Sequence, residues 1–290
     1  MRFGSRPLVV VLLVCTLGNG AFSQTRISEM RAAIERYTAD RGSLTRSYSV
    51  AISPARRARF KKFYEEWLAS LKPLDFDSMS QDGKIDYLLF KNHLEYELRQ
   101  LDIQAQQLAA IEPLVPFAGT MIDLEETRRR MEPIDSAKIA ATLTDLKKQI
   151  DERRRAVEGG LRVKKTVANR AVATMTGLRT SLRNWYTFYN GYDPLFTWWN
   201  EEPYKSLDQS LTAYDTLIKE RLLGLKVEAG KPQTVTNQEG GSQRSLSTNA
   251  KPGDATDIVG DPIGREALLS ELRSEMIPYT PEELIAIGEK

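Results

Sequence analysis

The chain has 290 residues, of which 41% are hydrophobic and 28% charged, with 41 basic side chains, 39 acidic ones and a single cysteine. This apolar content is enough for one large or two modest hydrophobic cores. The near-neutral charge gives no general electrostatic reason to bind nucleic acid or an anionic membrane surface, so we expect neither kind of partner.

Residues 1–23 have the pattern of a secretory signal peptide. Two arginines precede an apolar run from Leu8 to Leu17, and small and polar residues follow it, so we expect cleavage before Gln24. The run is too short for a stop-transfer helix, although an uncleaved membrane anchor is the alternative. Cleavage would remove Cys15 and two basic residues. We therefore expect a neutral, disulfide-free protein that is secreted or periplasmic and holds together by packing alone.

Amphipathic helices are predicted throughout the region 24–226, which we take as one helical domain. The segment from Ser28 to Asp40 predicts a short helix that ends at Arg41-Gly42, and a second helix begins at Pro54 and ends before Pro73. The second helix opens with the basic sequence ARRARFKK. Because two glutamates follow at once, we interpret this sequence as a solvated helix face.

The longest predicted helix runs from its N-cap Ser80 to Ile111. Its apolar side chains recur every three or four residues and therefore lie on one stripe. They are Tyr87, Phe90, Leu94, Leu98, Leu101, Ala105 and Leu108. At a rise of 1.5 Å per residue the helix is about 45 Å long. Because that exceeds the width of a small domain, other helices must pack along it, and we expect an all-α fold of layered long amphipathic helices.

A bend and three further helices are predicted next. Two prolines make 111–117 an extended bend, and its apolar residues should pack against the body. The helices run from Met121 to Met131, from the N-cap Ser136 to Gly159-Gly160, and from Val163 to Tyr186. The first two carry arginine triplets beside glutamates, where we expect surface ion pairs rather than nucleic-acid contacts.

The densest aromatic region lies between Trp185 and Tyr204. Gly191, Pro194 and Pro203 predict that much of it is irregular loop, followed by a helix from Pro203 to Leu223. A rigid loop rich in tryptophan and tyrosine can line a ligand cleft. The candidate residues of such a substrate cleft are Trp198, Trp199, Glu202 and Tyr204. The alternative is that these rings fill the joint between helices as ordinary core material.

Composition changes sharply over 227–257, which is rich in Gly, Pro, Ser, Thr, Asn and Gln and has no aromatic residue. Such a stretch cannot bury enough surface to offset its ordering entropy, which predicts a flexible linker or loop. The remaining residues, 258–290, contain one clear helix and the start of another, which Thr280 and Pro281 mark as N-cap and first helical residue. We expect the chain to stop within an incomplete C-terminal domain.

The sequence offers no recognisable catalytic apparatus. His93 is the only histidine, and a zinc site normally needs three or four protein ligands. There is no His-Glu zinc-protease motif, no Gly-x-Ser-x-Gly sequence and no phosphate-binding glycine loop. We therefore predict no catalytic residue and no metal ligand in this chain, and we interpret His93 as an ordinary surface or core residue.

Three segments resemble the first half of a large bacterial family of exported proteins, the domain of unknown function 885. They are QDGKIDYLLFKNHLEYEL, YDPLFTWWNEEPYKSLDQSLTAYDTLIKE and DIVGDPIGREALLSELRSEMIPYTPEELIAIGEK, and their order and spacing also agree with the family. The resemblance implies a mainly helical protein related to the gluzincin zinc peptidases. The family's His-Glu zinc motif lies in the second half, beyond the last residue of this sequence, so no ligand or catalytic residue is carried over.

Two classes of function remain open. The resemblance implies the N-terminal, cleft-forming part of an exported zinc-dependent peptidase that is inactive alone. Zinc is then expected only with the C-terminal half, which a separate gene could encode, and the substrate would be a peptide. The alternative is a non-catalytic helical binding or scaffold protein of the cell envelope.

Overall fold

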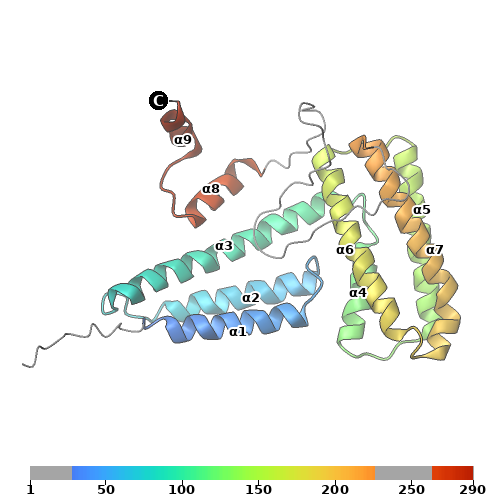
Figure 1. Cartoon of the computed structure of the whole chain (residues 1–290), viewed down its shortest axis with the longest axis horizontal. Helices are drawn as coiled ribbons and strands as arrows, with labels where there is room; N and C mark the ends of the chain where they lie inside the picture. The colour runs from blue at the N-terminus through green and yellow to red at the C-terminus, as the bar shows by residue number, and fades with distance from the viewer. Residues whose placement is uncertain (1–27, 226–262, 290) are drawn as a thin grey trace, which may run out of the picture.

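The computed structural model describes residues 28–225 and 263–289 (Figure 1). Within these residues the chain forms nine α-helices and one short π-helical segment and no strand, so the all-α prediction is confirmed. The predicted signal peptide, 1–23, and the predicted linker, 227–257, lie outside the described residues. In the described part of the chain, no helix is long and apolar enough to cross a membrane.

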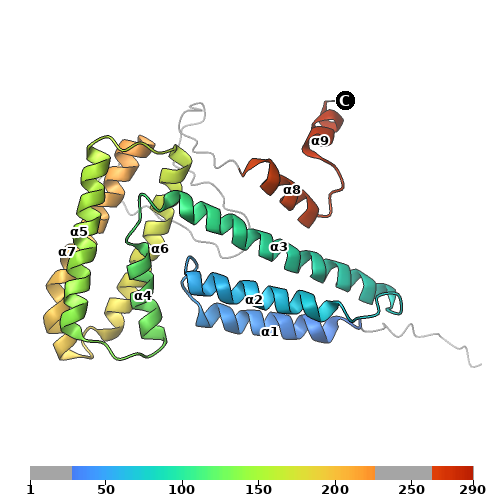
Figure 2. The same ribbon diagram turned by 180° about the vertical axis from the view of Figure 1, so that it is seen from behind.

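The first unit is a layer of three helices, seen from both sides in Figures 1 and 2. It consists of α1 (Arg31–Ser47), α2 (Pro54–Leu71) and the first half of α3 (Gln81–Ile111). Its core is largely aromatic, with Tyr37 stacked on Phe63 at a centroid distance of 5.4 Å. The buried members are Met30, Tyr37, Phe60, Phe63, Tyr64, Leu71, Phe90 and Leu94.

The second unit is a four-helix arrangement that stands across the end of this layer (Figure 1). It consists of α4 (Ala118–Arg129), α5 (Ser136–Glu158), α6 (Lys165–Tyr189) and α7 (Pro194–Ile218), and the π-helical segment Lys219–Leu223 extends α7. Leucine and isoleucine side chains at helical spacing on α5 and α7 are fully buried in its core. They are Leu143, Leu146, Ile150, Leu207 and Ile218.

Helix α3 belongs to both units. Phe90 and Leu94 lie in the first core, whereas Ile111 at the end of the helix lies in the second. The predicted packing of the 111–117 segment against the body is confirmed, since Leu114 and Phe117 are fully buried, although the segment forms turns rather than an extended bend. The region predicted as one helical domain therefore contains two cores that share one helix.

Polar contacts also join the two units beside α3. Arg129 Nη1 donates a hydrogen bond of 3.0 Å to the Arg46 carbonyl at the end of α1. The hydroxyl of Ser53, the N-cap of α2, donates to Glu126 on α4. The connection between α1 and α2 is thus tied directly to α4.

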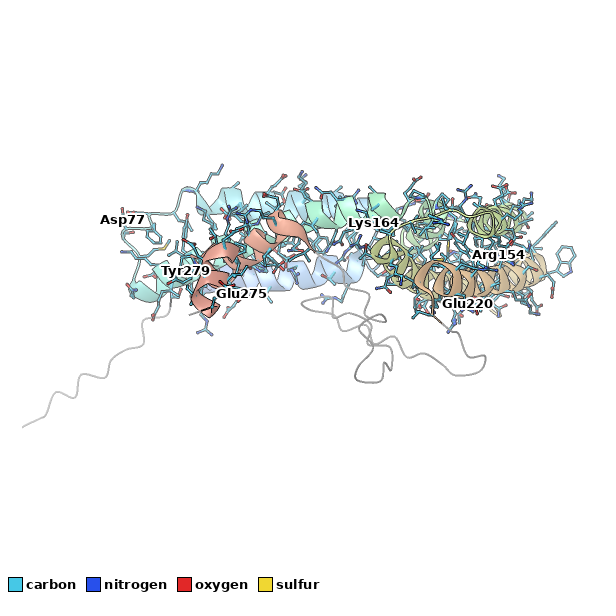
Figure 3. All side chains as sticks on the ribbon, turned by 90° about the horizontal axis from the view of Figure 1, so that it is seen from above. Asp77, Arg154, Lys164, Glu220, Glu275 and Tyr279 are labelled. Carbon is cyan, nitrogen blue, oxygen red and sulfur yellow. The ribbon has the colours of Figure 1, made fainter. Side chains whose placement is uncertain are left out.

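The last two helices are α8 (Gly264–Ser274) and α9 (Pro281–Gly288). Helix α8 packs on α3, and Asn92 Nδ2 donates to the Ser274 carbonyl at 2.8 Å. Helix α9 has the predicted N-cap Thr280, whose hydroxyl and Glu283 form a capping box, but none of its residues is buried. Viewed from above, Glu275 and Tyr279 project over the three-helix layer, toward the end that Asp77 marks (Figure 3).

The largest difference from the predicted elements concerns the aromatic region. The expected irregular loop is wrong, because α7 begins at Pro194 and passes through Pro203 without ending. The Asp193 carboxylate accepts hydrogen bonds from the amides of Leu195 and Phe196, at 2.9 and 3.0 Å, and Pro194 occupies the first helical position. An N-cap followed by proline is a helix start.

Among the other helix ends that differ from the predictions, two have a clear physical reason. Helix α1 does not end at Arg41-Gly42 but continues to Ser47, since a single glycine inside a helix costs only about 1 kcal/mol. The N-cap of α5 is Asp135 rather than Ser136. The Asp135 carboxylate accepts from two backbone amides, at 3.1 Å each, whereas Ser136 is the first helical residue and is buried.

Candidate functional site

The four predicted cleft residues all lie on α7, and their surroundings differ. Trp198 is 74% exposed, and its ring meets that of Trp199 edge-on at a centroid distance of 4.9 Å. Glu202 is exposed one turn further along, within 3.4 Å of Lys205 Nζ. Tyr204 instead stacks on Tyr186 of α6 at 3.8 Å. Three of the predicted residues thus lie on an exposed stretch of α7, and the fourth, Tyr204, lies between α6 and α7.

Other rings of the aromatic region are core material. Trp185, Tyr186 and Phe196 are buried, and Phe196 contacts the first two with centroid distances of 5.5 and 5.8 Å. The alternative that these rings fill a joint between helices therefore describes this part of the region well. It does not describe Trp198.

A polar cluster connects the three helices of the first unit. It is formed by Tyr37 and Arg41 on α1, Tyr64 on α2, and His93 and Glu97 on α3. The pairs on α1 and α3 are each four residues apart, so each pair lies on one helix face.

Hydrogen bonds join the side chains of this cluster into two groups, Tyr37 with His93, and Arg41 with Tyr64 and Glu97, while His93 Nε2 lies 3.9 Å from Glu97 Oε1. The Tyr37 hydroxyl lies 2.7 Å from His93 Nε2. Glu97 accepts from Arg41 Nη2 at 2.9 Å and from the Tyr64 hydroxyl at 3.0 Å. Arg41 Nε also donates to the Tyr64 hydroxyl at 3.4 Å. The carboxylate of Glu97 is therefore the centre of the cluster.

The protonation states of the cluster follow from its burial. Burial raises the pKa of Tyr64 to about 12, and the nearby Glu97 charge adds to the shift. Burial also raises the pKa of Tyr37 far above its ordinary value. It lowers the pKa of His93, an effect that Glu97 opposes and Arg41 reinforces. At neutral pH His93 is therefore uncharged, and its tautomer sets whether Nε2 accepts from the Tyr37 hydroxyl or donates to it.

Zinc does not fit this cluster. His93 Nε2 is bonded to Tyr37, and the carboxylate beside it in the described part of the chain is that of Glu97, with 3.9 Å between Nε2 and Oε1. Across the described residues, no three side chains from His, Cys, Asp and Glu come together in a way that could hold a metal ion. A zinc site normally takes three or four such ligands.

A cavity of about 140 Å³ lies beside the polar cluster. Its wall includes Arg41, Tyr64 and Glu97 from the cluster, together with Arg56 and Arg57 from the first turn of α2. The apolar part of the wall is formed by Ile52, Phe60, Leu101 and Leu108. The cavity therefore sits where the start of α2 meets the middle of α3, close to the junction of the two cores.

The two α2 arginines were not expected to form part of a site, because the ARRARFKK sequence was interpreted as a solvated face. One sequence signal does distinguish them. A helix N-terminus carries partial positive charge and favours acidic residues. Helix α2 has none in its first turn, where Arg56 and Arg57 stand instead.

A second feature is two groups of exposed apolar side chains, one on α3 and one on α9. The face of α3 that contacts α8 includes Asn92 and Tyr96, and the Tyr96 hydroxyl donates to Glu271 of α8 at 3.1 Å. The same face continues toward the start of α3 with three side chains that are 45–50% exposed. They are Ile85, Leu88 and Leu89. Helix α9 adds the exposed residues Leu284, Ile285 and Ile287. We call these six residues the apolar surface.

Comparisons of the chain with protein-family models, with curated proteins and with solved structures find no match.

Proposed function

We propose that the chain is the non-catalytic helical part of an exported zinc-dependent peptidase and that its apolar surface docks on the polypeptide that carries the zinc ligands. The resemblance of three segments to the family with domain of unknown function 885 supplies the peptidase class. The observation that carries the docking is the exposure of α9. The occupant is a polypeptide with a His-Glu zinc motif.

Helix α9 needs a packing partner to be stable. It has only eight residues, and none of them is buried. Isolated helices shorter than about 12 residues are marginal in water, because nucleation is costly and stability comes mainly from packing. Its capping box contributes stability at one end only. Because its apolar residues Leu284, Ile285 and Ile287 are exposed, docking on a further polypeptide would bury them and complete the helix's stabilisation.

The outer face of α3 supports the same occupant. The side chains of α8 satisfy the polar part of this face through Tyr96, Arg99 and Gln100. Ile85, Leu88 and Leu89 extend the face by helical spacing but remain exposed. A patch of neighbouring exposed apolar side chains is typical of an interaction site, whereas single exposed ones are common on any protein surface. A polypeptide lying along α3 next to α8 would cover them.

The test combines metal analysis and proteolysis assays. Zinc content by mass spectrometry and hydrolysis of a mixed peptide library are measured for the purified chain alone and after mixing with a C-terminal half that carries the His-Glu motif. We expect neither stoichiometric zinc nor hydrolysis from the chain alone, and both from the mixture. Tight zinc binding with chelator-sensitive hydrolysis by the chain alone would overturn the proposal.

Two matched variants test the docking itself. Ile285→Asp places a charge on α9, and Leu195→Asp places the same charge on α7; the two positions are 60% and 61% exposed. We expect Ile285→Asp to abolish association with the C-terminal half in analytical ultracentrifugation and Leu195→Asp to leave it unchanged. Equal association of both variants would contradict docking through the apolar surface.

A non-catalytic binding or scaffold protein of the cell envelope is the second candidate. The observation that favours it is the exposure of Trp198 and Tyr192, at 74% and 88%, since exposed aromatic rings are common in binding surfaces. The DNA next to this gene separates the two candidates. A reading frame with a His-Glu motif supports the peptidase, and its absence supports the scaffold.

A further inference from the structure

We propose that the cavity between the first turn of α2 and the middle of α3 binds a small monocarboxylate. This inference rests on the wall of the cavity and is independent of the docking function. Three features support it: the charge of the wall, the side chain of Arg57, and the size and apolar part of the cavity.

The wall of the cavity has an excess of positive charge. Arg41, Arg56 and Arg57 contribute three guanidinium groups, and among the described residues Glu97 is the only acidic one in the wall. The wall also contains Ser53, the N-cap of α2, whose hydroxyl already donates to the Glu126 carboxylate. The attraction for an anion entering the cavity would therefore come from the guanidinium groups on α1 and α2.

The three arginines of the wall differ in how the protein uses their hydrogen-bond donors. Arg41 donates to Glu97 and to Tyr64, and Arg56 donates to the Tyr48 carbonyl. Within the described residues, the half-buried side chain of Arg57 makes no hydrogen bond and no ion pair. A guanidinium carries five N–H donors. A carboxylate that accepts two of these donors side by side would stabilise a partly desolvated guanidinium. Arg57 is therefore the residue that we assign to the ligand.

The negative charge of Glu97 and the apolar part of the wall determine which kind of anion fits the cavity. Glu97 would repel a second negative charge, which disfavours a phosphate dianion. Phe60, Leu101 and Leu108 offer contact to an aliphatic group. The volume of about 140 Å³ is well below the roughly 300–1,000 Å³ of sites for drug-sized ligands, so only a small group can enter. A carboxylate with a short aliphatic part meets these three conditions.

Two sources of this chemistry are a free short-chain acid and the C-terminal carboxylate of a peptide. Isothermal titration calorimetry on the signal-peptide-free chain would use sodium butyrate, N-acetylvaline and N-acetylvaline amide as probes, with sodium chloride added to equal ionic strength. We expect saturable binding of at least one acid and none of the amide. Tighter binding of butyrate would identify a free short-chain acid as the ligand, and tighter binding of N-acetylvaline would identify the C-terminal carboxylate of a peptide.

Charge-matched variants locate the site on α2. Arg57→Gln removes the assigned guanidinium, and Lys61→Gln removes one charge from an exposed position of the same helix. Since hydrogen bonds to charged groups are among the stronger ones, we expect Arg57→Gln to raise the dissociation constant about tenfold or more and Lys61→Gln to leave it unchanged. Equal affinity of both variants would overturn the assignment, and so would phosphate binding as tight as that of the acids.

A measurement on the unaltered protein guards against a folding defect in the variant. Phenylglyoxal modifies accessible arginines, and peptide mass spectrometry reports the rate at each position. We expect the tighter acid to slow modification of Arg57 at least several-fold and to leave that of the exposed Arg36 unchanged. Protection of neither residue, or of both equally, would contradict a carboxylate site in this cavity.

Discussion

Tyr37 on α1 and His93 on α3 are 56 positions apart in the sequence, and 2.7 Å separates the tyrosine hydroxyl from Nε2 of the histidine. Their rings also meet edge-on, with centroids 5.5 Å apart. An unprotonated Nε2 accepts from the Tyr37 hydroxyl, whereas a protonated Nε2 donates to the tyrosine oxygen. The contact between α1 and α3 therefore includes the only histidine in the chain.

The first prediction concerns the titration of His93. Because burial lowers its pKa, we expect its single imidazole signal in NMR to titrate below the ordinary value of 6.5. Between the lowered pKa and 6.5 the unfolded chain binds more protons than the folded one, so stability increases with pH in that window. The stability that neutral His93 contributes is thus complete above about pH 6.5 and is lost as the pH falls toward the folded-state pKa.

His93→Gln is the control for this titration. Glutamine can accept a hydrogen bond from Tyr37 but does not ionise in this range. Chemical denaturation of the variant should show a smaller loss of stability between pH 6.5 and 5 than that of the original chain. A titration at or above 6.5, or the same loss in both proteins, would contradict the buried neutral state of His93.

The second prediction concerns the bond between α7 and the turn after α3. The Tyr214 hydroxyl donates to the Leu114 carbonyl at 2.8 Å, and both residues are fully buried. Tyr214→Phe leaves that carbonyl without its partner, which should lower the free energy of unfolding by about 1–3 kcal/mol. Tyr192→Phe removes a hydroxyl from a residue that is 88% exposed and should change stability by less than about 0.5 kcal/mol. Urea denaturation of both variants provides the comparison.

The third prediction separates two aromatic residues two positions apart on α7. Phe196 is fully buried against Trp185 and Tyr189, so Phe196→Ala should cost about 3–5 kcal/mol through lost burial and the cavity left behind. Trp198 faces solvent, so Trp198→Ala should change stability by less than about 0.5 kcal/mol. Thermal unfolding distinguishes the two. A large destabilisation by Trp198→Ala would mean that its ring is packed.

The fourth prediction concerns the attachment of α8 to α3. Glu271 accepts from the Tyr96 hydroxyl at 3.1 Å and from Gln100 Nε2 at 2.9 Å. Burial, with help from Glu271, raises the pKa of Tyr96 to about 12. Glu271→Ala should lower this pKa in an absorbance titration and speed amide exchange within α8, without changing the unfolding of the two cores.

Glu266→Ala serves as the matched control, since Glu266 is exposed on the same helix. It should leave the Tyr96 titration and the exchange rates of α8 unchanged. If Glu271→Ala also left both unchanged, α8 would not be held on α3 by this carboxylate.

The sequence predicted the long helix well because its signals agree with one another. Ser80 is a strong N-cap and accepts from the Gly83 amide at 3.1 Å, and the apolar stripe that includes Phe90 and Leu94 has an unbroken helical period. The start of α7 was missed because Pro194 and Pro203 were weighed as helix breakers. The pair Asp193-Pro194 is a helix start, and a proline within a helix can be tolerated when packing compensates.

The candidate sites were harder to predict, because exposure and long-range contacts are not visible in local patterns. Trp198 and Phe196 have similar aromatic neighbours in the sequence, but helix geometry turns one outward and the other into the core. Arg41 and Glu97 are 56 positions apart and meet only when α1 packs on α3. The cavity beside them combines these residues with the start of α2, and no spacing in the sequence indicates that combination.

The boundary between the two cores falls inside α3, so this helix fixes how one core is rotated relative to the other about the helix axis. Leu101 packs against the first core and Leu108 against the second, within the 31 residues of α3. Each residue advances an α-helix by about 100°, so inserting one residue between them would turn one core that far about the helix axis relative to the other. Evolution or engineering could therefore exchange the two units only by splices that preserve helical register, whereas a loop boundary would tolerate almost any length.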